Sequence, residues 1–528
     1  MLSENIKYLR KKSGHSQEKL AELLGVTRQA VQKWEKGTAQ PDTDRLIGLS
    51  RLFGVTTDAL LNNEDADDEK LRFNVPVTPK YDRIQQWEAY YSQLLIELRQ
   101  CIDEGKDVQH YKQLVEETDK LPNDRYKKEL ADVICDMLSS APPVAGYKYR
   151  EPSELQQIKL LCKGVDAMSV PENIEKRIAG AWLGRICGCV LGKPVECMKL
   201  HELVPFLKEN KNYPMHRYVL TTDVTKDVRR RFTYPFWIDC FADTLECCPV
   251  DDDTNYTIMA SLVTKKYGRD FTADNVAEAW IDLQVKNAYC TAERVAYKNI
   301  IDGYAPPETA IVHNPYREWI GAQIRADYYG YINPGDPVEA ANAAFRDASV
   351  SHVKNGIYGA MFAAAAIAAA ACVKTPVEAL EAGLACVPSS SRLWEYVSGV
   401  INDWRNGASF EDFSKKLNMD WDDREAYDWC HVIPNAAIVA AALLYGRGDY
   451  GKTICLAVQS GFDTDCNGAT AGSICGMMFG EDAIGEWAAP IHGAVDTTVG
   501  GTGRVSLREL TERTLRAMKN TSEGVGER

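Results

Sequence analysis

The sequence predicts an all-α protein with a small helical head, a helical linker region and a large helical body. Apolar residues recur at three- and four-residue steps along much of the 528-residue chain, which is the spacing of amphipathic helices. Alanine-rich runs at 359–372 and 436–442 are strong helix formers, and few stretches alternate as strands do. With 45% hydrophobic and 26% charged residues, the composition is that of a globular protein.

Charge divides the chain into a basic head and an acidic body. Residues 1–62 carry ten Lys and Arg against seven Asp and Glu, a net +3; the whole chain is −14, so the remaining 466 residues carry −17. An acidic body repels a polyanion, so we expect any nucleic-acid contact in the head. The expected parts are a head at 1–62, an acidic hinge and helical linker at 63–165, and a body at 166–528.

The sequence gives no sign of export or membrane insertion. The opening MLSENIKYLRKK lacks an apolar core with a cleavage site, and the longest nearly apolar stretch, 356–373, is mostly alanine and is expected to be a buried helix. The 16 cysteines form no CxxC, and the 8 histidines form no HxH or HExxH. These patterns argue against a disulfide framework and a zinc enzyme, and favour a cytoplasmic protein without a membrane partner.

The head has the start and stop signals of short helices around a glycine turn. Ser16 and Thr27 are expected to cap two successive helices, and Gly25 is expected to end the first of them. These two helices, a longer one and a short last one are expected at 17–24, 28–36, 41–54 and 57–61.

Two short helices around a glycine describe a helix-turn-helix. The residues that carry the pattern, and that resemble the Cro/lambda-repressor family over about 60 residues, are Gln17, Ala21, Gly25, Val26, Val31 and Trp34. The resemblance implies that the second helix enters the major groove of double-stranded DNA, as part of a homodimer that spans two half-sites. The residues expected to contact phosphates or base edges are Gln17, Arg28, Gln29, Gln32 and Lys33. The alternative is a small helical bundle that contacts proteins.

The region between head and body carries no catalytic motif. The polar, acidic run 62–70 suits a hinge, and apolar residues from Trp87 to Cys101 predict an amphipathic helix. Further helix is expected at 107–119 and 123–139. We interpret this region as a spacer or dimerisation element, with the Trp87–Cys101 stripe as a surface where subunits meet.

Three stretches of the body stand out. Glycines at 180, 184, 188 and 192 lie on one helix face, and the sequence Lys-Pro-Val-Glu196 follows them. Three aspartates at 251–253 precede an expected helix, whose dipole favours carboxylates at its start. Asp463 and Asp465 lie in a turn that can direct two carboxylates at one cation. Each stretch alone has a structural explanation: tight helix packing, helix capping or an Asp-rich turn.

Together and in this order, the three stretches resemble the ADP-ribosylglycohydrolase family from about residue 170 to 516. The resemblance implies an all-α body with two Mg²⁺ ions, which hydrolyses a ribosyl bond in an ADP-ribosylated protein or a small ADP-ribose-containing molecule. Glu196 matches the family's loop glutamate and is the expected catalytic residue. The expected metal positions are Asp251, Asp252, Asp253, Asp463, Asp465 and Cys466.

Two of these positions depart from the family pattern. Asp251 and Cys466 stand where the family has a Ser or Thr hydroxyl. A carboxylate still supplies oxygen, but a sulfur suits magnesium poorly, so we expect a carbonyl or water in place of the Cys466 side chain.

The resemblance also implies contacts to the ADP-ribose moiety. Gln323 aligns with the family's Gly-rich loop, without its usual Asn-Gly, and Ser351, His352 and Gly356 match a second contact strip. His352 is equally consistent with a packing role. Two alternatives stay open: a regulator whose body senses an ADP-ribose-like ligand without turnover, and a hydrolase of another ribosylated small molecule with the head as a tether.

Overall fold

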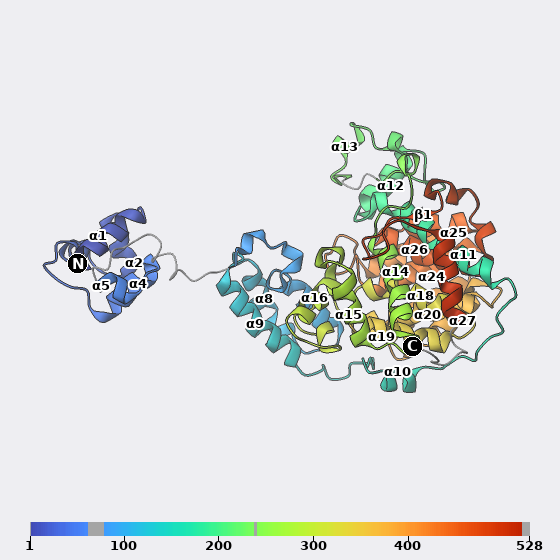
Figure 1. Cartoon of the computed structure of the whole chain (residues 1–528), viewed down its shortest axis with the longest axis horizontal. Helices are drawn as coiled ribbons and strands as arrows, with labels where there is room; N and C mark the ends of the chain where they lie inside the picture. The colour runs from blue at the N-terminus through green and yellow to red at the C-terminus, as the bar shows by residue number, and fades with distance from the viewer. Residues whose placement is uncertain (1, 62–78, 237–239, 520–528) are drawn as a thin grey trace. The chain divides into compact units, whose positions relative to one another are not determined.

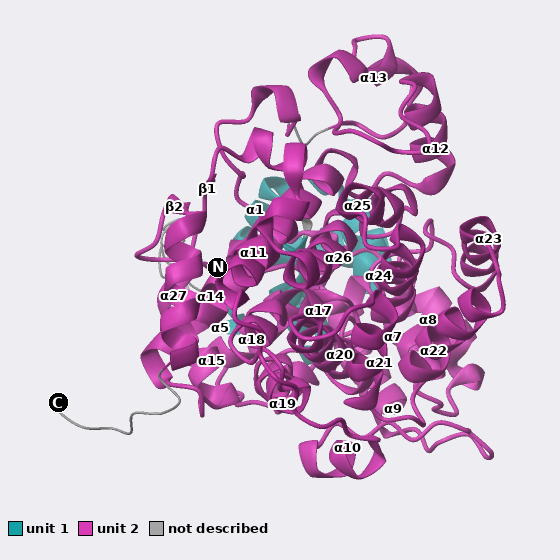
Figure 2. Ribbon diagram, turned by 90° about the vertical axis from the view of Figure 1, so that its right-hand side faces the viewer, with its two compact units in different colours: residues 1–83 teal, residues 84–528 magenta. Residues whose placement is uncertain are grey.

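The computed structural model describes residues 2–61, 79–236 and 240–519, which are predominantly helical as predicted. They divide into two compact units, residues 1–83 and 84–528 (Figures 1 and 2). The strands of the described part, β1 (Ala494–Val495) and β2 (Val505–Ser506), pair antiparallel with Ala494 opposite Ser506. The expected acidic hinge at 62–70 lies outside the described residues. Over the described part, every helix is too short or too polar to cross a bilayer.

The head forms the helices that its sequence predicts. Ser16 Oγ accepts the Lys19 backbone N–H at 3.0 Å, and Thr27 Oγ1 accepts that of Ala30 at 3.3 Å. Gly25 ends the first of these helices in the left-handed conformation, with φ of 62°. The helices are α1 (Leu2–Lys12), α2 (Gln17–Leu24), α3 (Arg28–Glu35), α4 (Thr43–Phe53) and α5 (Thr57–Leu61).

The first helices of the second unit form a segment that we call the strap, residues 84–161. Its helices are α7 (Leu94–Asp103), α8 (Lys112–Asp119), α9 (Arg125–Ser140) and α10 (Leu155–Leu161). Buried ion pairs join the strap to the rest of the unit. Arg317 Nη1 lies 2.7 Å from Glu97 and its Nε lies 2.7 Å from Glu104, while Arg392 binds Glu151 at 2.8 Å. The strap therefore packs into the same compact unit as the body.

The stripe from Trp87 to Cys101 differs from its prediction in two ways. Residues Gln86–Glu88 and Tyr90–Ser92 form separate 3₁₀ turns, and regular helix starts only at Leu94. The apolar face is buried within this chain, with Leu94 and Cys101 each 0% exposed. The buried residues of the stripe are covered by the protein's own body and are not a free surface for a second subunit, so the expectation is wrong for them, whereas Leu95 is 46% exposed.

The rest of the second unit is a helical bundle around α20 and α24, whose residues are buried almost without exception. In Figures 1 and 2, α12 and α13 lie together at one end of it. Its helices are α11 (Ile174–Gly192), α12 (Leu200–Glu209), α13 (Val228–Arg231), α14 (Asp252–Tyr267), α15 (Ala273–Leu283), α16 (Thr291–Ile301), α17 (Gly321–Arg325), α18 (Asp327–Tyr331), α19 (Pro337–Ala348), α20 (Lys354–Ala370), α21 (Pro376–Ala385), α22 (Arg392–Arg405), α23 (Phe410–Asp420), α24 (Val432–Gly446), α25 (Tyr450–Gln459), α26 (Thr464–Phe479) and α27 (Leu507–Lys519).

Glycines on α11 and α26 let these two antiparallel helices touch backbone to backbone. A Cβ atom on Gly184 would lie 2.3 Å from the carbonyl oxygen of Gly472, and a Cβ atom on Gly180 would lie 2.5 Å from that of Gly476. Real Cβ atoms do not approach a backbone so closely, so only glycine fits at these steps. This explains the four-residue glycine repeat as helix packing, one of the two roles that the sequence allowed.

Candidate active site

The glycine contact between α11 and α26 brings two of the three motifs together: the glycine repeat that ends at Glu196, and the turn with Asp463 and Asp465. At its end, a Cβ atom on Gly192 would lie 2.4 Å from the backbone nitrogen of Asp465. Thr464 Oγ1 donates to the Gly192 carbonyl oxygen at 3.0 Å. The end of α11, from which the chain turns toward Glu196, is therefore fixed against the start of α26.

The third motif begins α14 and is anchored by a buried arginine on α11. Asp251 is the N-cap of α14, and its Oδ1 accepts the Asp253 N–H at 2.8 Å. Arg185 Nη2 donates to Asp253 Oδ1 at 2.9 Å, and Arg185 Nη1 donates to Asp327 Oδ2 at 2.7 Å. Helix capping was one of the two interpretations of this stretch, and Asp251 does cap α14. Asp253 does not cap the helix; its side chain is buried in the protein.

Two carboxylate oxygens in this region are buried without a hydrogen-bond partner. They are Asp253 Oδ2 and Asp465 Oδ1, on side chains of residues that are 0% and 2% exposed. Ligand atoms of Asp253, Asp465 and Cys466 all lie within 4.8 Å of one another. A buried, unpaired carboxylate is costly, and a divalent cation with oxygen ligands would satisfy it. The carboxylates of Asp253 and Asp465 therefore fit a hard metal ion.

Burial and mutual repulsion raise the pKa of most of the acidic groups. The pKa of Asp465 lies well above its usual range because the group is buried and faces Glu196 and Asp251. The pKa values of Asp252 and Asp463 are also raised, first by burial and then by neighbouring carboxylates. Without a cation, these raised pKa values favour the protonated form of the carboxyl groups. A bound cation would relieve the same repulsion.

Glu196 faces the cluster from the turn that follows α11. Burial, together with the charges of Asp251 and Asp463, raises its pKa to about 8 despite the nearby Lys193. Lys193 itself contacts Asp251 through Nζ. Burial would raise the pKa of Asp251, but this ammonium group lowers it. The structure thus places Glu196 among the predicted metal ligands, in reach of their charges.

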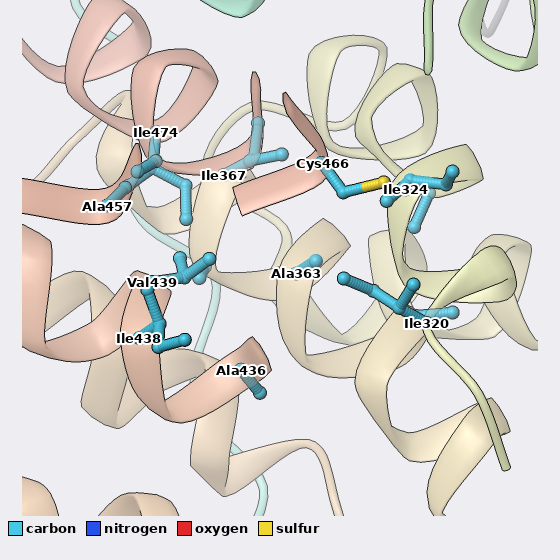
Figure 3. Close-up of a cluster of buried hydrophobic side chains, with 14 of the residues drawn as sticks. Ile320, Ile324, Ala363, Ile367, Ala436, Ile438, Val439, Ala457, Cys466 and Ile474 are labelled. Atoms are coloured by element: carbon cyan, nitrogen blue, oxygen red, sulfur yellow. The ribbon is translucent and has the colours of Figure 1, made fainter. Parts of the chain in front are cut away.

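The cysteine at the expected hydroxyl position is a neutral thiol. Burial raises the pKa of Cys466 well above its usual value, and Asp253 and Asp463 raise it further. Figure 3 shows its sulfur directed toward Ile324, at the edge of an apolar cluster. A neutral thiol is a poor ligand for magnesium, as the sequence suggested, although its sulfur lies within 4.8 Å of carboxylate oxygens of Asp253 and Asp465.

The predicted ADP-ribose contacts are buried side chains with unused polar atoms. Gln323 is 1% exposed, and neither atom of its side-chain amide has a partner. His352 Nδ1 lies 2.8 Å from Ser351 Oγ, while its Nε2 has no partner. Burial and Arg325 keep the pKa of His352 well below its usual value, so the ring is neutral. Gly356 has a packing reason, because a Cβ there would lie 2.6 Å from the Arg317 carbonyl. Ligand contacts at these positions stay a prediction.

In the head, the predicted base-reading residues share the exposed face of α3. Arg28, Gln29, Gln32 and Lys33 are all exposed, whereas Val31 and Trp34 on the other face are buried. Gln17 is partly buried, and its Nε2 donates to Glu35 at 2.7 Å. The side-chain amide of Gln17 is therefore bound to Glu35 at the start of α2, and its contact with a DNA phosphate stays a prediction.

Four residues of the site were not predicted from the sequence: two positively charged side chains, one aspartate and one cysteine. Arg185 and Lys193 neutralise aspartates far along the chain, and Asp327 shares Arg185. Cys189 lies within 4.8 Å of the ligand atoms of Asp251 and Asp253. Lys193 stands beside the Pro-Val-Glu motif, but nothing in the local sequence identifies its partner.

Comparison with known proteins matches both parts of the chain. The ADP-ribosylglycohydrolase model matches residues 170–523, and the helix-turn-helix model matches residues 6–60. The first of these covers more than half of the chain, so the chain belongs to the ADP-ribosylglycohydrolase family. It carries, in addition, a helix-turn-helix DNA-binding domain.

Curated relatives match the head. The SPbeta prophage-derived uncharacterized HTH-type transcriptional regulator YonR of Bacillus subtilis (strain 168) is 44% identical over 66 residues, which is 12% of this chain and 61% of that protein. The uncharacterized HTH-type transcriptional regulator YqaE of the same organism is 37% identical over 83 residues, 15% of this chain and 72% of that protein. The HTH-type transcriptional activator BcrR of Enterococcus faecalis is 41% identical over 63 residues, 12% of this chain and 31% of that protein.

A solved structure titled "ADP-ribosylglycohydrolase-related protein complex" aligns with 67% of this chain and 100% of its own, at 19% identity and a TM-score of 0.38.

Proposed function

We propose that the body is a metal-dependent ADP-ribosylglycohydrolase, which cleaves a ribosyl glycosidic bond and releases ADP-ribose, and that the head directs it to specific DNA sites. One observation carries the catalytic part of the proposal. Two buried carboxylate oxygens, Asp253 Oδ2 and Asp465 Oδ1, lack partners in the cluster that Glu196 faces. This arrangement offers an oxygen-lined cation site beside a candidate acid-base group.

A divalent cation bound there would supply Lewis-acid chemistry, by fixing ribose hydroxyls and making water more acidic. The chain's own groups would do the rest. Cleavage of a ribosyl bond passes through a positively charged, oxocarbenium-like state, which surrounding carboxylates stabilise electrostatically. Glu196 would accept a proton from water at a carboxylate oxygen. In the metal-free cluster burial and neighbouring carboxylates raise its pKa to about 8, and a cation bound beside it would lower that pKa and favour the proton-accepting carboxylate.

Two buried groups that the sequence predicted as ADP-ribose contacts would hold the ligand. The unused side-chain amide of Gln323 offers both a donor and an acceptor, and the neutral ring of His352 offers Nε2. Unpaired polar atoms reject a ligand that cannot bond to them, so they would favour a ribosyl group with hydroxyls over an apolar analogue.

A second candidate is a transcription regulator whose body binds an ADP-ribose-like ligand without turnover. The neutral thiol of Cys466, at a position where an oxygen ligand was expected, favours it. The DNA-binding head is compatible with both candidates.

Release of free ADP-ribose decides between them. The full-length protein would be incubated with peptides ADP-ribosylated on arginine, serine or cysteine, with magnesium or with excess chelator. Magnesium-dependent ADP-ribose in the chromatogram would support the hydrolase. Tight binding of ADP-ribose by calorimetry without product from any substrate would favour the regulator.

A further inference from the structure

Lys193 and Asp251 form an ion pair inside the acidic cluster. Lys193 directly follows the last residue of α11, and its Nζ contacts Asp251 Oδ2. Their side chains are 14% and 2% exposed, so the pair is largely removed from water. The second oxygen of Asp251 accepts the Asp253 N–H at 2.8 Å. Both oxygens of Asp251 therefore already have partners within the protein.

Two other aspartates of the cluster, Asp253 and Asp465, each have a carboxylate oxygen without a partner. These atoms, Asp253 Oδ2 and Asp465 Oδ1, are buried. One carboxylate oxygen of each of these residues and the Cys466 sulfur lie within 4.8 Å of one another. The amino group of Lys193 is a compact charge with three donors, the kind of group that can stand where a small cation would. The cluster thus has two cations of its own, Lys193 at Asp251 and Arg185 at Asp253 Oδ1, and it leaves Asp253 Oδ2 and Asp465 Oδ1 as oxygens that a divalent ion could bind.

We propose that the body binds a single divalent cation, between Asp253 and Asp465, and that the ammonium group of Lys193 takes the place of a second one beside Asp251. This inference rests on the proposed metal-dependent function and replaces its expected count of two ions per body. A second divalent ion at Asp251 would have to displace the ammonium group or lie against it, and like charges repel strongly in a buried site. Lys193 is then a built-in counter-ion, and Asp251 is its partner and the cap of α14 instead of a metal ligand.

The number of bound ions tests the proposal without any measurement of activity. Mn²⁺ serves as the probe, because oxygen ligands that suit magnesium also suit manganese and because its electron paramagnetic resonance separates isolated ions from coupled pairs. We expect the full-length protein to bind one Mn²⁺ per chain by calorimetry, with the spectrum of an isolated ion.

The informative variant combines Lys193→Met with Asp251→Ser. It removes both members of the pair, leaves the net charge unchanged and keeps a side chain that can cap α14. We expect it to bind two Mn²⁺ per chain with a coupled spectrum, while thermal melting shows that it remains folded. The matched control is Lys199→Met, which removes a lysine of the same loop that stacks on Trp429 at 5.0 Å, and it should bind one ion.

Other results would overturn the proposal. Two coupled ions in the unchanged protein would show that the ammonium group of Lys193 does not take the place of a second metal ion. One ion in the folded double variant would show that no second position exists to be replaced. No ion in any of the three proteins would overturn the proposed metal-dependent function as well, so the two failures can be told apart.

Discussion

Gly188 of α11 and Gly468 of α26 meet backbone to backbone: a Cβ atom on Gly188 would lie 2.0 Å from the Gly468 carbonyl oxygen. The obstacle is main chain, which cannot rotate away as a side chain can. This contact lies midway along the glycine repeat whose end carries the Glu196 turn and the start of α26. The packing of two helices therefore determines the geometry of the candidate active site.

Gly188→Ala should destabilise the second unit, because the two helices must separate to admit a methyl group. Overpacking of this kind costs about 1–3 kcal/mol. Urea unfolding of the full-length protein would measure it. Gly399→Ala is the matched control: Gly399 lies in α22 with nothing within 4 Å of an added Cβ. Alanine there should be neutral or stabilise by about 0.5–1 kcal/mol. Equal stability of the two variants would contradict the packing argument.

Arg317→Met should loosen the strap. Arg317 is buried between Glu97 and Glu104, and its removal leaves two carboxylates without their main partner. Breaking a buried pair from one side costs about 3–5 kcal/mol. Hydrogen exchange of α7 would report it. The control is Lys112→Met, which removes an exposed pair with Glu116 at 3.8 Å and should cost about 0–1 kcal/mol. Unchanged exchange in the Arg317 variant would mean that the pairs of Arg317 with Glu97 and Glu104 do not hold the strap in place.

Glu196→Gln should preserve the fold and the bound metal while lowering turnover by about 10²–10⁴-fold, the usual contribution of an acid-base group. Glutamine has the same shape but accepts no proton. Single-turnover release of ADP-ribose would measure the loss, and calorimetry with magnesium would check the metal. Glu246→Gln, at an exposed position, serves as the control. Turnover of the Glu196 variant within twofold of the unchanged protein would remove Glu196 from the mechanism.

Local signals explain which parts of the fold the sequence predicts well. In the head, the caps at Ser16, Gly25 and Thr27 act on residues within one helical turn, and the predicted helices agree with the structure almost to the residue. The stripe after Trp87 has helical spacing but breaks into 3₁₀ turns before Leu94. Its apolar spacing revealed a buried face but not the helix boundary or the partner that covers it.

In the candidate site, too, some residues could be predicted from local sequence motifs and others could not. Its aspartates were predicted from short motifs, and the structure brings Asp253 and Asp465 together from helices more than 200 positions apart. Its internal cations were not predicted, because Arg185 reaches Asp253 and Asp327 only through tertiary contacts. The local sequence around a lysine or arginine does not indicate which distant carboxylate it will pair with in the folded protein.

The final prediction concerns the head. If α3 reads the major groove, DNA affinity should fall steeply as salt rises, because phosphate contacts release counterions. Arg28→Ala with Gln29→Ala should reduce specificity by about 1–3 kcal/mol for each lost bidentate contact. Arg28 now pairs with Glu18 at 2.8 Å on the exposed surface, an interaction weak enough for DNA to replace. Release of ADP-ribose should be unchanged in this variant, because both substitutions lie in the other compact unit.

Selection of binding sites from a random DNA library, followed by titration at several salt concentrations, provides the measurement. Arg51→Ala is the matched control, since it removes an exposed arginine of the same head from α4 instead of α3. It should weaken binding to all sequences alike, without changing the selected site. A head that enriches no sequence, or an α3 variant that selects the same site with the same affinity, would contradict recognition by α3. The head would then be better explained as a tether that binds another protein.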